Sequence, residues 1–282
     1  MPEGAFTVAT FNVRCPGDQG DIVWYRRMPR ISRIVRDHGF DIFGVQECVD
    51  HQAAILDTDL HDYARVGCGR NADRGGEAMY IYYRKNRFEL IEDGTFWLSG
   101  TPDEPGSRLP GAGCPRDCTW GLFADRVTGR LVRVYNTHLD LASAALRREE
   151  MRILLEHGVE AAKARGEAVF LMGDFNETLD DDDTPDAAFR LRGPALAARA
   201  EGNAVALASL ALVDTYASAL LPHAGPVRTC HGYKDEPTNR IDYIFASPNV
   251  RVLAHATLTD KPEGEFASDH YPVAATVEVG SR

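Results

Sequence analysis

The sequence predicts an α/β protein in which amphipathic helices cover buried strands. Residues 168–172 are five consecutive apolar residues followed by Gly173, the pattern of a fully buried strand. Residues 24–38 carry apolar side chains at helical spacing with basic residues between them, and Gly39 follows, which indicates a helix lying on a sheet. The chain has no repeat, no low-complexity linker and no break in composition, so we expect one domain over residues 1–282.

The other elements of the first half follow from the same patterns. Residues 6–11 and 40–47 are expected to be strands, and residues 53–60 a short helix. Residues 78–83 and 88–98 are expected to pair as a hairpin. The next segment, residues 99–118, holds four prolines and four glycines and is too long and too irregular for a simple turn. A loop facing the substrate and a surface insertion both fit this segment.

The second half continues the alternation of strands and helices. Residues 143–165 form the clearest amphipathic helix, and residues 185–212 are expected to be helical in pieces. The four acids at 180–183 fit a solvated helix start better than a metal site. Further strands are expected at residues 119–124, 131–136, 240–245, 250–258 and 271–279.

Composition and charge restrict the classes of function. With 44% hydrophobic and 26% charged residues, the chain has the composition of a soluble globular protein. It has no apolar run long enough for a membrane span and no signal-peptide pattern, so the cytoplasm is expected unless a leader was removed. The net charge of -11 disfavours binding to extended nucleic acid. The sequence leaves the oligomeric state open.

The six cysteines do not form a recognisable metal-binding pattern. Only Cys114 and Cys118 lie close in sequence, and their spacing without a second close pair matches structural zinc sites poorly. Free or buried thiols are therefore favoured, and a disulfide between these two remains an alternative in an oxidising compartment.

Polar side chains stand at the ends of six expected strands. Because side chains alternate along an extended segment, Asp174 and Asn176 are expected to face the same side, although both are also ordinary turn residues. If the six ends meet at one rim, four carboxylates share a site and need a cation, for which Mg²⁺ or Mn²⁺ is suited. These residues are Asn12, Glu47, His138, Asp174 with Asn176, Asp242, and Asp269 with His270.

Six short motifs in this order resemble the endonuclease/exonuclease/phosphatase superfamily, over residues 6–279. The resemblance implies a DNase I-like fold, a four-layer α/β/β/α sandwich of two packed mixed β-sheets, and Mg²⁺-dependent hydrolysis of phosphoesters. The motifs are Phe11-Asn12, Gln46-Glu47, Asn136-Thr137-His138-Leu139, Gly173-Asp174-Phe175-Asn176, Arg240-Ile241-Asp242-Tyr243 and Ser268-Asp269-His270.

The resemblance also implies a role for each matching residue. Glu47 would be the main metal ligand, with Asn12 and Asp269 beside it. Asp174 would orient or deprotonate the attacking water, and Asn176 would hold water and phosphate. The remaining catalytic residues would be the phosphate-binding His138 and His270, with Asp242 fixing the tautomer and charge of one imidazole. Such groups fit phosphoryl transfer, which depends on positioning and charge neutralisation.

The substrate is the least determined part of the prediction. Nucleases with this fold often carry a tyrosine where Glu77 stands here, and this difference, together with the acidic charge, disfavours nuclease activity. Arg14, Trp24 and Arg116 are expected to line a small pocket, although Trp24 fits a helix start packed on the sheet equally well. We expect a metal-dependent phosphoesterase for a small sugar- or lipid-derived phosphoester, with mono- and diesters both open. A nuclease is the alternative, and a non-catalytic binding module on the same fold is the second.

Overall fold

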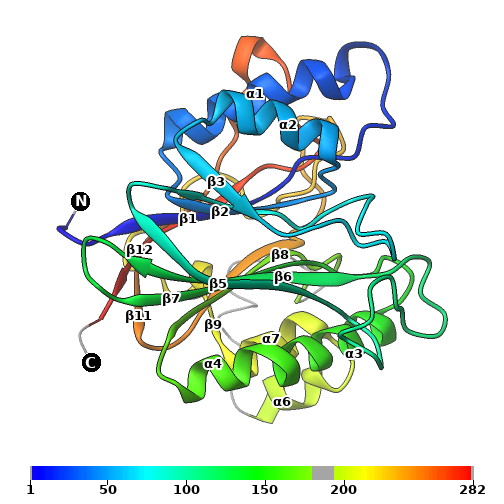
Figure 1. The fold of residues 1–282 in the computed structure, drawn as a ribbon, viewed down its shortest axis with the longest axis vertical. Helices are drawn as coiled ribbons and strands as arrows, with labels where there is room; N and C mark the ends of the chain where they lie inside the picture. The colour runs from blue at the N-terminus through cyan, green and yellow to red at the C-terminus, as the bar shows by residue number, and fades with distance from the viewer. Residues whose placement is uncertain (1, 180–193, 281–282) are drawn as a thin grey trace.

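Two six-stranded β-sheets pack face to face in the computed structural model, which describes residues 2–179 and 194–280 (Figure 1). The first sheet is antiparallel except for the parallel pair of β1 and β2. Its order is β11 (Val250–Thr257), β12 (Val273–Val279), β1 (Phe6–Asn12), β2 (Ile42–Gln46), β4 (Ile81–Arg84) and β3 (Tyr63–Val66).

The second sheet repeats this pattern with one parallel pair, β7 and β8. Both sheets are therefore mixed, as the resemblance implied. The strand order is β5 (Phe88–Trp97), β6 (Asp117–Asp125), β7 (Leu131–His138), β8 (Ala168–Asp174), β10 (Asp242–Ala246) and β9 (Val213–Asp214).

Helices cover the outer face of each sheet and complete four layers (Figure 1). The first sheet is covered by α1 (Trp24–His38) and α2 (Asp50–Asp59). The second is covered by α3 (Ala144–Leu154), a π-helical turn (Leu155–Val159), α4 (Glu160–Ala164), α6 (Pro194–Ala200) and α7 (Ala204–Ala211). Three short helices complete the described chain, η1 (Gly20–Ile22), α8 (Thr215–Ser218) and η3 (Pro262–Gly264).

The apolar strands are buried on both faces, which explains their continuous hydrophobic runs. In β8, Phe170 and Met172 pack between the two sheets, whereas Val169 and Leu171 pack under the helices. A strand covered on both sides has no solvent face to keep polar, so its sequence does not alternate. The strand expected at 168–172 is confirmed, and it extends to Asp174.

One sequence-based expectation about the fold is wrong. The strands expected as a hairpin, β4 and β5, lie in different sheets: β4 pairs with β2 and β3, and β5 pairs with β6. Ile81 and Phe88 both enter the core between the sheets, so their hydrophobicity does not distinguish a hairpin from a crossover. The helix expected at 143–165 is confirmed as a continuous helical segment over residues 144–164, which contains one π-helical turn.

Other expectations have mixed outcomes. The helix at 24–38 is confirmed and ends at Gly39, whose φ of 62° is left-handed. Strands β3 and β9 were not expected. Both are short, and β9 has only two residues. The acidic run at 180–183 lies outside the described residues, whereas α6 and α7 confirm helical pieces in residues 194–212. All six cysteines are free thiols.

Candidate active site

The strand register places three polar side chains in one row at the end of the second sheet. His138 is the partner of Asp174 in the parallel pair of β7 and β8. Asp242 is the partner of Asp174 in the antiparallel pair of β8 and β10. Residues separated by more than 100 positions in the chain therefore become neighbours, as the clustering of strand ends predicted.

Asn12, at the end of β1, connects this row to the first sheet. Its Nδ2 donates to Asp174 Oδ2 over 2.9 Å and to Glu47 Oε1 over 3.0 Å. Its Oδ1 accepts the backbone N–H of Arg14, 2.9 Å away. The amide thus fixes one carboxylate from each sheet, and Ser268 Oγ in turn donates to the Asn12 carbonyl.

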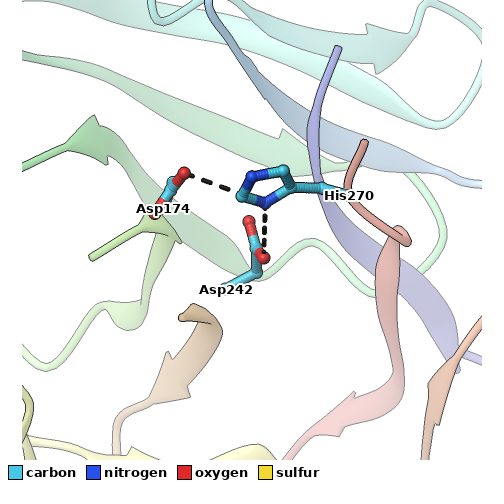
Figure 2. Close-up of side chains that lie close together, drawn as sticks. All are labelled: Asp174, Asp242 and His270. Carbon is cyan, nitrogen blue, oxygen red and sulfur yellow. Dashed lines mark hydrogen bonds and ion pairs between the residues drawn. The ribbon is translucent and has the colours of Figure 1, made fainter. Parts of the chain in front are cut away.

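His270 forms a buried ion pair with Asp242. Figure 2 shows the imidazole between Asp242 and Asp174, with Nδ1 lying 2.9 Å from Asp242 Oδ2 and 3.8 Å from Asp174 Oδ2. Burial disfavours a charged imidazole, but the Asp242 carboxylate outweighs burial and raises the pKa of His270 well above its usual value. His270 is therefore an imidazolium at neutral pH.

His138 is in the opposite state. Burial, and then the positive charge of Arg116, hold the pKa of His138 well below its usual value. Its Nε2 lies 2.9 Å from Asn176 Nδ2, which also donates to the Leu139 carbonyl. A neutral imidazole that accepts at Nε2 carries its proton on Nδ1, and this buried atom has no partner among the described residues.

The carboxylates of the site also differ in their protonation. Burial, and then the negative charge of Asp242, raise the pKa of Asp174 to about 7. Burial opposes ionisation of Glu47, whereas His138 and hydrogen bonds from Asn12 and the Cys15 N–H lower its pKa below the usual range. Because His138 itself is neutral, the contributions that persist are the two hydrogen bonds and the positive charge of His270.

The donor set fits a divalent cation. Ligand atoms of Asp174, Asp242 and His270 lie within 4.8 Å of one another. Asp242 Oδ1 is buried without a hydrogen-bond partner in the described chain, and a cation would offset both the burial and the neighbouring Asp242 charge that raise the pKa of Asp174. His270 Nδ1 and Asp242 Oδ2 already pair with each other. The atoms that remain to bind a cation are Asp242 Oδ1 and the carboxylate oxygens of Asp174. Such oxygens suit a hard metal ion.

Three residues around the site hold left-handed backbone conformations. Arg14, Glu47 and Asn176 have φ values of 61°, 60° and 49°. This conformation costs a non-glycine residue about 1–2 kcal/mol and tends to persist at functional sites. Asn176 therefore does not continue an extended strand, so the alternation expected for Asp174 and Asn176 is not what places Asn176 at the site.

The predicted substrate-binding residues lie at different distances from this centre. Arg14 Nη1 contacts Asp269 Oδ2 at 3.3 Å, which places both at the rim beside Asn12. Arg116 is buried and donates to the His138 carbonyl over 3.4 Å. Trp24 packs its ring on His51, with centroids 4.5 Å apart, and makes no recorded contact with the residues of the row.

Several residues that support the site were not predicted. Asn136 crosses from the second sheet and donates to the carbonyls of Val45 and Tyr80 in the first. Thr229 donates its hydroxyl to Asp242 Oδ2 and accepts the Asp242 N–H. Asn136 lies in one of the motifs and so carried a signal, whereas nothing in the sequence around Thr229 distinguishes it from a loop residue.

Comparison with known proteins agrees with this geometry. The sequence model of the Endonuclease/Exonuclease/phosphatase family matches residues 9–270. The chain belongs to this family. It is therefore an enzyme of the phosphoric ester hydrolase class, and family membership also implies dependence on a metal ion. Among curated proteins, none matches the chain significantly.

Solved structures of family members have the same fold. A mannosyl-6-phosphatase from Bacteroides thetaiotaomicron is 31% identical with a TM-score of 0.81, and the match covers 96% of this chain and 99% of that one. A family protein from Bacteroides vulgatus is 30% identical with a TM-score of 0.82, covering 98% and 99%. A Danio rerio TDP2 complexed with single-stranded DNA product is 17% identical with a TM-score of 0.70, covering 97% and 99%, and shows the fold alone.

Proposed function

We propose that this chain is a phosphoesterase that acts as a single domain on a small, sugar- or lipid-derived phosphoester by in-line attack of water. The observation that carries the proposal is the buried row of His138, Asp174 and Asp242, joined by His270 and by Glu47 through Asn12. The similarity to a mannosyl-6-phosphatase supports a small phosphoester.

Glu47 and Asp269 would hold the ion beside the Asp174 and Asp242 oxygens, to which Asn12 links Glu47, with Mg²⁺ favoured, Mn²⁺ as an alternative and Asn12 as a third candidate ligand. The low pKa of Glu47 supports an ionised ligand. A divalent cation supplies neutralisation of phosphoryl charge and acidifies a bound water. Asn12 Nδ2 donates to the carboxylates of Glu47 and Asp174. These hydrogen bonds favour a role for Asn12 in orienting the two carboxylates over a role as metal ligand.

The other side chains position the reactants. Asp174, with Oδ1 fixed by the Asn176 N–H and Oδ2 by Asn12, would accept the proton of the attacking water. The His270 imidazolium, held by Asp242, would donate to a phosphoryl oxygen. His138 and Asn176 would bind the other oxygens of the phosphoryl group. Positioning and charge stabilisation of this kind are what phosphoryl transfer requires.

Nuclease activity is the second candidate, and the charge of -11 disfavours it. The experiment that tests the proposal measures hydrolysis of p-nitrophenyl phosphate, bis-p-nitrophenyl phosphate and a single-stranded oligonucleotide with Mg²⁺, Mn²⁺ or EDTA. The proposal predicts metal-dependent release of p-nitrophenol with little cleavage of DNA. Cleavage of DNA in preference to both small substrates would favour the nuclease.

A further inference from the structure

A cavity of about 670 Å³ opens beside the catalytic row, on the side of the loop that follows β8. This volume is in the range of pockets that bind small molecules and exceeds what a phosphate group needs. The residues that matter for its chemistry are Arg147, Asn176, Glu177, Thr178, Asn203 and Asn239.

The cavity shares a wall with the phosphate site. Asn176 lines it and also lies 2.9 Å from His138 Nε2. Ile241 lines it as well, and its carbonyl accepts the N–H of Phe175 at 2.8 Å. The wall is thus made by residues directly after Asp174 and directly before Asp242. When a phosphoryl group is bound at the row, the group esterified to it lies next to this cavity.

The charged groups of the wall already have hydrogen-bond partners. Arg147 Nη2 lies 3.1 Å from Glu177 Oε1, and Arg147 Nη1 donates to the Asp140 carbonyl. Glu177 Oε2 accepts the Ala204 N–H over 2.7 Å. Arg199 at the rim donates to the Leu179 carbonyl. An ionic leaving group would have to break these contacts, so the wall favours an uncharged one.

Neutral hydrogen-bonding groups remain at the mouth. The Asn239 side chain is exposed and makes no hydrogen bond to the described part of the chain, and its amide offers both donors and an acceptor. The Thr178 hydroxyl likewise has no hydrogen-bond partner among the described residues. None of the described lining residues carries an aromatic ring, which is the usual platform for a nucleobase.

We propose that this cavity is the leaving-group subsite and that it takes a neutral polyhydroxylated group, a sugar or polyol, with Asn239 as a specificity-determining residue. The inference rests on the proposed function, because it requires phosphoester hydrolysis in the adjacent row. In that reaction the water oxygen bonds to phosphorus and the bond from phosphorus to the sugar oxygen breaks. Water gives one proton to Asp174, which returns it to solvent, and the sugar oxygen keeps the electron pair of the broken bond and takes a proton from solvent.

The test compares kcat and KM for glucose 6-phosphate, AMP and p-nitrophenyl phosphate with Mg²⁺. The wild type is expected to prefer glucose 6-phosphate to AMP by at least about tenfold in kcat/KM. Asn239→Ala should lower the ratio of kcat/KM for glucose 6-phosphate to that for p-nitrophenyl phosphate about tenfold, mainly through KM, as expected for losing one or two hydrogen bonds. Ala198→Phe, which adds volume at the cavity wall, should lower the same ratio.

Glu236→Ala is the matched control, since Glu236 is exposed in the same loop and does not line the cavity. It should leave both kcat/KM values at the wild-type level. Equal effects of Asn239→Ala on glucose 6-phosphate and p-nitrophenyl phosphate, or wild-type turnover of AMP without preference for glucose 6-phosphate, would overturn the subsite alone. Absence of metal-dependent turnover of every phosphoester would instead overturn the proposed function.

Discussion

Asp242 holds His270 through an ion pair of 2.9 Å in which both side chains are buried. Thr229 donates to the same carboxylate oxygen, so the orientation of Asp242 is fixed from a second direction. The other imidazole of the site, His138, is neutral and lies beside Asn176. One site therefore holds one charged and one neutral imidazole, and their environments determine which is which.

Replacing Asp242 by asparagine should lower the pKa of His270 and with it the turnover. We expect a loss of about 10²–10³ in kcat on p-nitrophenyl phosphate, the usual effect of removing one charge-stabilising group. Asp260→Asn is the matched control, because Asp260 pairs with His38 at the same 2.9 Å on the surface. Equal activity in the two variants would contradict the role of the buried pair.

Glu47→Gln should weaken metal binding. Addition of Mg²⁺ at about 100 times its Kd should stabilise the wild type by about 2.7 kcal/mol, seen as a rise in Tm in thermal unfolding. We expect Glu47→Gln to lose most of this rise. Glu89→Gln is the control, since Glu89 pairs with Arg126 at 3.1 Å on the surface, and it should keep the rise. The opposite pattern would move the ion away from Glu47.

Gly173 is required for the close approach of β7 and β8. Its φ is 148°, and a Cβ there would lie 1.9 Å from the Thr137 carbonyl oxygen. Gly173→Ala should therefore separate His138 from Asp174 and destabilise the fold by at least about 3 kcal/mol in urea unfolding. Gly113→Ala, where a Cβ would meet nothing within 4 Å, should change stability little. A folded and fully active Gly173→Ala protein would contradict this explanation.

Glu150 should make stability depend on pH. Burial raises the pKa of this α3 carboxyl to about 8, although its Oε2 accepts the Asp140 N–H. Between about pH 4.5 and 8 the folded state holds a proton that the unfolded state releases, so the free energy of unfolding falls as the pH rises.

Glu150→Gln removes this contribution and keeps an acceptor for the Asp140 N–H. We expect the variant to be more stable than the wild type by on the order of 2 kcal/mol at pH 9, with no gain at pH 4. Urea unfolding across this range measures the difference. Glu149→Gln, which changes a carboxylate paired with Arg152 near the surface of the same helix, should leave the slope from pH 5 to 9 unchanged. If the free energy of unfolding of Glu150→Gln depended on pH as it does in the wild type, the pH dependence would not come from Glu150.

The sequence predicted which polar residues lie together better than it predicted their contacts. Polar residues at strand ends are visible in the chain, and the fold brings Asn12, His138, Asp174 and Asp242 together. Hydrophobic pattern could not place β4 and β5 in separate sheets, because both contribute to the same core. Thr229 reaches Asp242 only through tertiary structure, so no local pattern reveals it.

The most direct test of the central claim measures Mg²⁺-dependent hydrolysis of p-nitrophenyl phosphate and bis-p-nitrophenyl phosphate by the wild type, Asp174→Ala and His270→Ala. Circular dichroism would confirm that the variants remain folded. The clustered site predicts that EDTA abolishes wild-type turnover and that each variant loses at least about 10² in rate. Folded variants with wild-type turnover would show that catalysis takes place elsewhere in the protein.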